Sequence, residues 1–78
     1  MMSWIVVVTL LVQVSNGNEG YIWLRGSDWY KSYTDCNADV EDAAERILVR
    51  FHATNERLGG SFDVLFVWKM CELTVPIS

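Results

Sequence analysis

Residues 4–12 read Trp-Ile-Val-Val-Val-Thr-Leu-Leu-Val, a run that is apolar except for Thr9. Residues 1–18 contain no charged side chain. Most of the run is β-branched, which restricts side-chain rotation in the way that strands favour. The β-branched positions are Ile5, Val6, Val7, Val8, Thr9 and Val12, and Val14 follows just after the run. We therefore predict a buried strand that is apolar on both faces.

A membrane-spanning helix and a cleaved signal peptide are the alternatives for this segment. A spanning helix needs roughly 20 apolar residues, and the run is already interrupted at Gln13 and Ser15. A signal peptide would use the run as its apolar region and residues 15–17 as its cleavage site, but no Lys or Arg precedes the run. The strand is favoured because removal of residues 1–17 would leave the next strand without a neighbour.

The residues after this run indicate a hairpin. Asn16-Gly17 is a typical hairpin turn, and residues 21–25, Tyr-Ile-Trp-Leu-Arg, have the pattern of a second strand. Gly26-Ser27-Asp28 marks a turn or a bulge. Residues 29–34 then either continue a bent second strand or form a short third one, and the sequence does not separate these two interpretations.

An amphipathic helix is predicted between residues 39 and 58. Residues 35–38 are expected to be a connector, Asp39 and Asp42 resemble a capping box at the helix start, and Gly59-Gly60 ends it. Apolar side chains recur at intervals of three and four residues, which defines one buried stripe. The stripe consists of Val40, Ala43, Ala44, Ile47, Leu48, Phe51 and Leu58.

Residues 62–73 are predicted to form the last strand, which Pro76 would end. Strict alternation places Phe62, Val64, Phe66, Trp68 and Met70 on one face and Leu65, Val67 and Cys71 on the other. The whole chain, residues 1–78, is thus expected to be one small α+β domain. Its mainly antiparallel sheet would have three to four strands, in the order strand, strand, optional third strand, helix, strand. One helix would pack on one face, so apolar surface should remain exposed on the other.

The two cysteines, Cys36 and Cys71, lack the spacing of a zinc site, and no metal is expected. Two reduced, buried cysteines in a cytoplasmic protein are the favoured interpretation. A disulfide is the alternative. The helix runs away from Cys36 and the last strand runs back, so both residues are expected at the same end of the domain.

Charge narrows the possible partners. Ten acidic and six basic residues give a formal net charge of −4, which opposes direct binding of nucleic acid. Five acids fall within eleven residues that contain no base, and a protein with a basic surface would complement them. These acids are Asp35, Asp39, Glu41, Asp42 and Glu45. Compensation of the helix dipole is the simpler explanation for part of the cluster.

The predicted helix also divides its exposed charges by sign. Arg46, Arg50 and Arg57 line one flank of the apolar stripe, whereas Glu41, Glu45, His52 and Glu56 line the other. An ion pair between Asp42 and Arg46, four residues apart, is expected on the exposed surface. Aromatic residues exposed on the sheet would anchor a partner, and Trp23, Trp29 and Tyr33 are the candidates.

Nothing in the sequence indicates catalysis. His52 is the only histidine and is expected to be an ordinary exposed residue. No nucleophile with a base, phosphate-binding glycine loop or Cys/His cluster can be assembled. We therefore expect a protein that is not an enzyme, needs no cofactor, and acts neither on nucleic acid directly nor in a membrane.

In general character, this small, acidic, aromatic-rich α+β chain resembles the inhibitors that bacteriophages encode against host machinery, including anti-CRISPR proteins. The resemblance implies a cytoplasmic protein of the host cell that occludes a basic nucleic-acid-binding surface. Two other functions remain open. One is a small secreted protein with a cleaved N-terminal signal and a disulfide between Cys36 and Cys71; the other is a homodimeric structural module joined through the uncovered sheet face.

Overall fold

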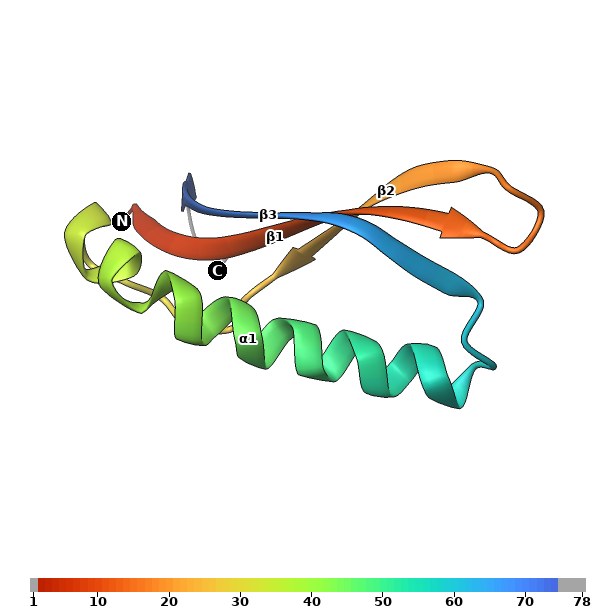
Figure 1. The fold of residues 1–78 in the computed structure, drawn as a ribbon. Helices are drawn as coiled ribbons and strands as arrows, with labels where there is room; N and C mark the ends of the chain where they lie inside the picture. Colours follow the sequence, from red (N-terminus) through yellow and green to blue (C-terminus); the bar gives the residue numbers. More distant parts are fainter. Residues whose placement is uncertain (1, 75–78) are drawn as a thin grey trace.

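A computed structural model describes residues 2–74. The chain forms strand β1 (Ser3–Val14), strand β2 (Glu19–Arg25), helix α1 (Tyr33–Arg57) and strand β3 (Phe62–Thr74). The strands make one antiparallel sheet in the order β2-β1-β3, and α1 runs along one side of it (Figure 1). This arrangement confirms the predicted α+β class. The expected end of the last strand at Pro76 lies outside the described residues.

The optional third strand between residues 29 and 34 does not form. Only Tyr30 pairs with the sheet there, through a single antiparallel bridge to Trp4. The two residues exchange backbone hydrogen bonds of 2.8 Å in both directions. At Gly26 the chain still lies against β1: its N–H donates to the carbonyl oxygen of Val6 at 2.8 Å, and a Cβ atom there would lie only 3.3 Å from that oxygen. A glycine therefore lets the connector pass close to β1.

Strand β1 is the centre of the structure, as the apolar run predicted. It pairs with β2 on one side and β3 on the other, while β2 and β3 do not pair with each other. Its side chains alternate, and Val6, Val8, Leu10 and Val12 form the core beneath the sheet with Ala43 and Ala44 of α1. Val8 and Leu10 have no exposed surface. The core therefore rests on the segment for which the sequence also offered a signal-peptide interpretation.

Helix α1 begins six residues before the predicted start at Asp39. Ser32 is the N-cap, and its hydroxyl accepts a hydrogen bond of 3.1 Å from the backbone N–H of Asp35. The prediction of a connector over residues 35–38 and of a capping box at Asp39 and Asp42 is therefore wrong. Tyr33 and Thr34 favour strands by propensity, but the serine cap and the acid in the first turn override that preference.

The predicted helix end at Gly59-Gly60 is confirmed, and Asn55 holds the turn into β3. Its side-chain amide donates to the carbonyl of Phe62 at 3.0 Å and accepts from the N–H of Phe62 at 3.2 Å. Both glycines have positive φ angles, of 98° and 67°, which only glycine adopts readily. Leu58 lies beyond the helix and is 69% exposed, so its assignment to the buried stripe is wrong.

A β-bulge in β3 changes the predicted faces of this strand. Leu11 pairs with Phe66, but the next residue, Val12, pairs with Val64, so Leu65 is an extra residue. Strict alternation consequently fails at this point. Phe62 and Val64 pack on the core together with Val67 and Cys71, and do not share a face with the residues that follow the bulge.

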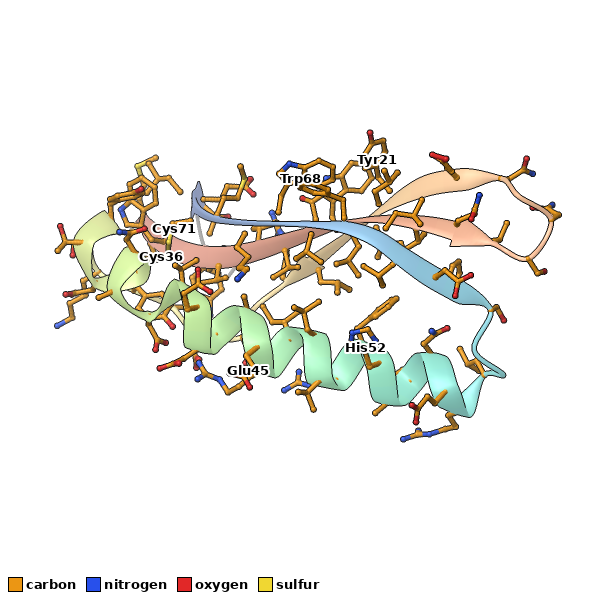
Figure 2. All side chains as sticks on the ribbon, in the orientation of Figure 1. Tyr21, Cys36, Glu45, His52, Trp68 and Cys71 are labelled. Carbon is orange, nitrogen blue, oxygen red and sulfur yellow. A yellow bond between two sulfur atoms is a disulfide. The ribbon has the colours of Figure 1, made fainter. Side chains whose placement is uncertain are left out.

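Cys36 and Cys71 are joined by a disulfide between the start of α1 and the far end of β3 (Figure 2). Their expected position at the same end of the domain is confirmed, but the favoured interpretation as two reduced cysteines is not what the structure contains. Cys36 is fully buried against the core cluster. The covalent bond fixes the N-terminal part of the helix to an edge strand.

Reduction of this disulfide should lower the free energy of unfolding by about 3–4 kcal/mol, because the two cysteines are 35 residues apart and the unfolded chain gains the entropy of an open loop. Urea denaturation with and without a reductant measures the difference. The double variant C36A/C71A is the control and should lose the response to reductant. An identical unfolding midpoint for the oxidised and reduced chain would contradict the bond.

Removal of residues 1–17 should abolish cooperative folding, because β2 and β3 pair only through β1. Circular dichroism during thermal denaturation of a chain of residues 18–78 tests this expectation. The full-length chain should show a sigmoidal transition and the shortened chain a gradual one. A cooperative transition in the shortened chain would show that the sheet has another way to close.

Candidate functional site

The face of the sheet opposite α1 is broad, apolar and aromatic. Odd-numbered side chains of β1 and β2 point to this face, together with even-numbered side chains of β3 after the bulge. Five large side chains are between 41% and 68% exposed here: Tyr21, Trp23, Phe66, Trp68 and Met70. Figure 2 shows Tyr21 and Trp68 projecting from the sheet on the side away from the helix. We call these five residues the aromatic face.

The aromatic rings contact one another across the strands. Tyr21 stacks on Trp23 within β2, with ring centroids 6.2 Å apart. It also approaches Trp68 of β3 at 6.1 Å, and Phe66 packs on Trp68 at 4.6 Å. Thr9 lies on β1 between Trp23 and Trp68 and is opposite both of them in the register. The short threonine leaves a shallow depression lined by Thr9, Tyr21, Trp23, Trp68 and Met70.

Charged side chains stand only at the ends of this face. Glu19 and Asp63 pair in register with Gln13 at the hairpin end. Arg25 pairs with Val7, and Glu72 with Ile5, toward the other end. On this side of β1, Thr9 and Leu11 lie beside the rings and are partly buried. Ile5 and Val7, toward the Arg25 and Glu72 end, are only 3% exposed. An apolar centre with a polar rim is the composition typical of a protein-binding surface.

Only one of the three predicted sheet anchors is placed as expected. Trp23 lies on β2 in the aromatic face and is 68% exposed. Trp29 is exposed in the connector that precedes α1, and Tyr33 is the first residue of the helix. The ring of Tyr33 packs edge-on against Trp4, with centroids 5.2 Å apart. The prediction that Trp29 and Tyr33 are sheet residues is therefore wrong, because the strand ends at Arg25.

Most of the aromatic face was not predicted from the sequence. Tyr21 and Trp68 belonged to predicted strands but were not selected as site residues, and neither were Phe66 and Met70. The alternation of β3 contained the signal for Phe66, Trp68 and Met70, which lie on one face in the predicted pattern and in the structure. The bulge at Leu65 obscured this signal. Strict alternation placed Phe62 and Val64 on the same face as Phe66, Trp68 and Met70, whereas in the structure they pack on the core.

Two of the acids in the predicted cluster form hydrogen bonds or ion pairs with other residues of the protein. Asp39 accepts hydrogen bonds from the hydroxyl of Tyr30 and, at 3.3 Å, from Arg46. Glu41 forms an ion pair of 2.6 Å with Lys69 of β3. Asp35, Asp42 and Glu45 are exposed on the helix. Two of the five predicted partner-binding acids, Asp39 and Glu41, therefore already bond to other residues of the protein.

The predicted pair between Asp42 and Arg46 is not formed. Arg46 instead bonds to Asp28 in the connector, at 3.0 Å, and to Asp39. Arg46 reaches across from the helix to the connector, and with Tyr30 it links residues 28–30 to α1. Asp42 lies on the outer side of the helix, so competition from Asp28 and Asp39 removes the expected local pair.

This polar bridge changes the acidity of its members. Burial and the hydrogen bond to Asp39 raise the pKa of Tyr30 to about 12. The same hydrogen bond, with the bonded Arg46 guanidinium, holds the pKa of Asp39 below its usual value. The hydrogen bond to Asp39 also raises the pKa of Arg46. Each shift favours the state in which Tyr30 is neutral and the ion pair is intact.

The aromatic face and the exposed acids lie on opposite sides of the molecule. Glu45 is on the helix surface that points away from the sheet, whereas Tyr21 and Trp68 project from the other side (Figure 2). The helix and the sheet thickness separate them. A single flat partner surface therefore contacts either the aromatic face or the acids, but not both.

The other candidate features have ordinary structural environments. His52 is exposed on α1, and its ring packs edge-on against Phe51 with centroids 5.7 Å apart. Among residues 2–74, no three His, Cys, Asp or Glu side chains are placed to hold a metal ion. Within the same range, no helix is both long and apolar enough to cross a bilayer.

Comparison of the chain with protein-family models, with curated proteins and with solved structures finds no match.

The polar bridge predicts a loss of stability in strongly alkaline solution. Tyr30 has a raised pKa in the folded state, so its contribution is fully present below about pH 10, the usual value for tyrosine, and is lost as the pH rises toward about 12. Urea midpoints measured across this range should fall more steeply for the natural chain than for the Tyr30→Phe variant. Parallel curves for the two proteins would contradict the bridge.

Proposed function

We propose that this protein is a small, non-enzymatic inhibitor that binds another protein through the aromatic face. The observation that carries the proposal is the exposure of Tyr21, Trp23, Phe66, Trp68 and Met70 in one continuous surface. Exposed apolar patches of this kind mark interaction sites, because they are costly to leave in contact with water. Tryptophan and tyrosine are also the residues that most often dominate binding energy.

The shape of the face favours a broad protein partner. The central depression is shallow and open, and the rings around it stand on two different strands. Such a surface fits an apolar patch or a short helix on a partner better than it encloses a small molecule. The charged rim at Glu19, Arg25 and Glu72 would orient the partner without supplying most of the affinity.

In a second candidate function, the protein binds its partner through the exposed acids of α1, on the side opposite the aromatic face. Asp35, Asp42 and Glu45 would there occupy the basic surface of a nucleic-acid-binding protein, as an anti-CRISPR protein or another phage inhibitor of host machinery would do in the host cytoplasm. The net charge of −4 and the exposure of these three carboxylates support this second candidate. It is the weaker one, because Asp39 and Glu41 are held by Tyr30, Arg46 and Lys69.

Two other functions proposed from the sequence use the same structural elements. The secreted form would depend on the Cys36–Cys71 bond, but cleavage after residue 17 would remove the central strand of the sheet. The dimeric module would cover the aromatic face with a second copy. Folding of the shortened chain of residues 18–78 tests the secreted form, and the oligomeric state of the full-length protein tests the dimeric module.

Two matched double variants separate the aromatic from the acidic candidate. Tagged protein is used to capture partners from a bacterial lysate at low and at high salt. The double variant Trp23→Ser with Trp68→Ser should abolish capture. Truncation of a hot-spot tryptophan typically weakens the binding free energy by about 2 kcal/mol or more, and this variant removes two of them. Asp42→Lys with Glu45→Lys should leave capture unchanged. Retention at high salt is also expected for an apolar contact.

The control for apolar exposure in general is Val49→Ser, because Val49 is 63% exposed but lies on the helix. It should behave like the natural chain. Capture that survives loss of both tryptophans, and disappears with salt or with the two lysines, would contradict the aromatic candidate and support the acidic one. Circular dichroism of each variant verifies that the fold is intact.

A further inference from the structure

Among residues 2–74, no strand pairs with the outer edge of β2, so the backbone groups on this edge are available for pairing. The N–H of Gly26 donates to the carbonyl of Val6 at 2.8 Å, and the N–H of Val14 donates to the carbonyl of Asn18 at 2.9 Å. In an antiparallel ladder the residues bonded to one neighbour alternate with those that point away from it. The even-numbered residues of β2 therefore bond to β1. Glu19, Tyr21, Trp23 and Arg25 present their N–H and C=O groups to solvent.

The helix side of β2 is also incompletely covered. Helix α1 packs mainly over β1 and β3, and Ile22 and Leu24 of β2 remain half-buried. A depression lies between this strand and the helix and is lined by Leu24, Ile47 and Phe51, with Arg25 and Arg50 among its other residues. A further strand beside β2 would therefore meet unpaired backbone groups and partly exposed apolar side chains.

The other edge of the sheet is protected. Lys69 of β3 points toward the helix and bonds to Glu41 at 2.6 Å, which places a charged pair beside the edge. Cys71 ties the same strand to α1, and the bulge at Leu65 interrupts its regular pairing. Charged residues and bulges are the usual means by which sheets block pairing with another chain. Strand β2 has neither an inward charge nor a bulge.

We propose that β2 pairs with β2 of a second copy of this chain, antiparallel and centred on Ile22. This register places Glu19 opposite Arg25 of the second copy, and Tyr21 opposite Trp23 of the second copy. All of these residues have outward-pointing backbone groups, so every pair between them is a hydrogen-bonded pair. A register shifted by one residue would place outward groups opposite inward ones and could not form the ladder.

The side chains are complementary in the same register. On the aromatic side, Glu19 of one copy lies opposite Arg25 of the other, at both ends of the paired strands. Between these ends, Tyr21 of each copy lies opposite Trp23 of the other. On the helix side, Leu24 of one copy lies opposite Gly20 of the other, and the two Ile22 side chains meet at the centre. A Cβ atom built on Gly20 would contact nothing within 4 Å, so this position has room for the leucine.

The resulting assembly is a continuous six-stranded sheet with a two-fold axis perpendicular to it. Both helices lie on one side of this sheet, and the two aromatic faces join on the other. The aromatic faces stay exposed, so the dimer neither requires nor prevents the proposed binding of a partner. Failure of one proposal leaves the other standing, because oligomeric state and partner capture are measured separately.

Charge reversal tests the pairing, with sedimentation equilibrium measured for the full-length protein over a range of concentrations. The natural chain should form a dimer. Glu19→Arg or Arg25→Glu alone places like charges opposite each other at both ends of the paired strands. Each should therefore raise the dimer dissociation constant about tenfold or more. The double variant E19R/R25E restores opposite charges and should return the constant to within about threefold of the natural value.

Arg57→Glu is the matched control, because Arg57 is an exposed arginine at the end of α1, away from β2. It should leave the dissociation constant unchanged. A natural chain that stays monomeric up to about 1 mM would overturn the proposal. If each single charge reversal weakens the dimer but the double variant E19R/R25E does not restore it, the proposed register is wrong. A dimer insensitive to both reversals but lost in Trp68→Ser would show pairing through the aromatic face instead.

Discussion

The structure depends on one constraint: its central strand is apolar on both faces, and the part of the chain that the structure describes has one helix, which covers only the first of them. Val6, Val8, Leu10 and Val12 are buried beneath α1, while Ile5 and Val7 point to the other face and are buried there by neighbouring side chains. The second face thus needs large side chains on the flanking strands. Arg25, Met70 and Glu72 stand opposite Ile5 and Val7 in the register, and the aromatic rings of β2 and β3 flank Thr9 and Leu11. The rings are themselves exposed. Burial of β1 and formation of a candidate binding surface are two consequences of the same arrangement.

Four ties hold the helix in place on the first face. The disulfide joins its start to β3, and the amide of Asn55 holds the turn at its other end. On one flank Arg46 and Asp39 bond to the connector, and on the other Glu41 bonds to Lys69. A domain of this size buries only about 60% of the surface of its unfolded chain, so such ties supplement a small core. They also explain why several charged residues that look available in the sequence are already engaged.

The sequence predicts the fold well where apolar periodicity is uninterrupted. The central strand, the hairpin turn and the helix end at Gly59-Gly60 follow directly from residue types. The errors have local causes. The helix begins after Ser32, although Tyr33 and Thr34 favour strands, because the Ser32 hydroxyl accepts a hydrogen bond from the backbone N–H of Asp35 and caps the helix. The bulge at Leu65 places Phe62 and Val64 on the face opposite to the one that strict alternation predicted. Arg46 bonds to Asp28, 18 residues away in sequence, in place of its predicted local partner Asp42. Contacts between residues far apart in sequence decided which acids and aromatics were free, and no local pattern contains that information.

The most direct test of the account is the accessibility of the aromatic face in the isolated protein. A soluble paramagnetic probe broadens the nuclear magnetic resonance signals of exposed groups and spares buried ones. The account predicts strong broadening of the indole signals of Trp23 and Trp68, with the methyl signals of Val8 and Leu10 unaffected. Indole signals of Trp23 and Trp68 that are protected as well as Leu10 would show that something covers this face. The claim that it is an open binding surface would then be wrong.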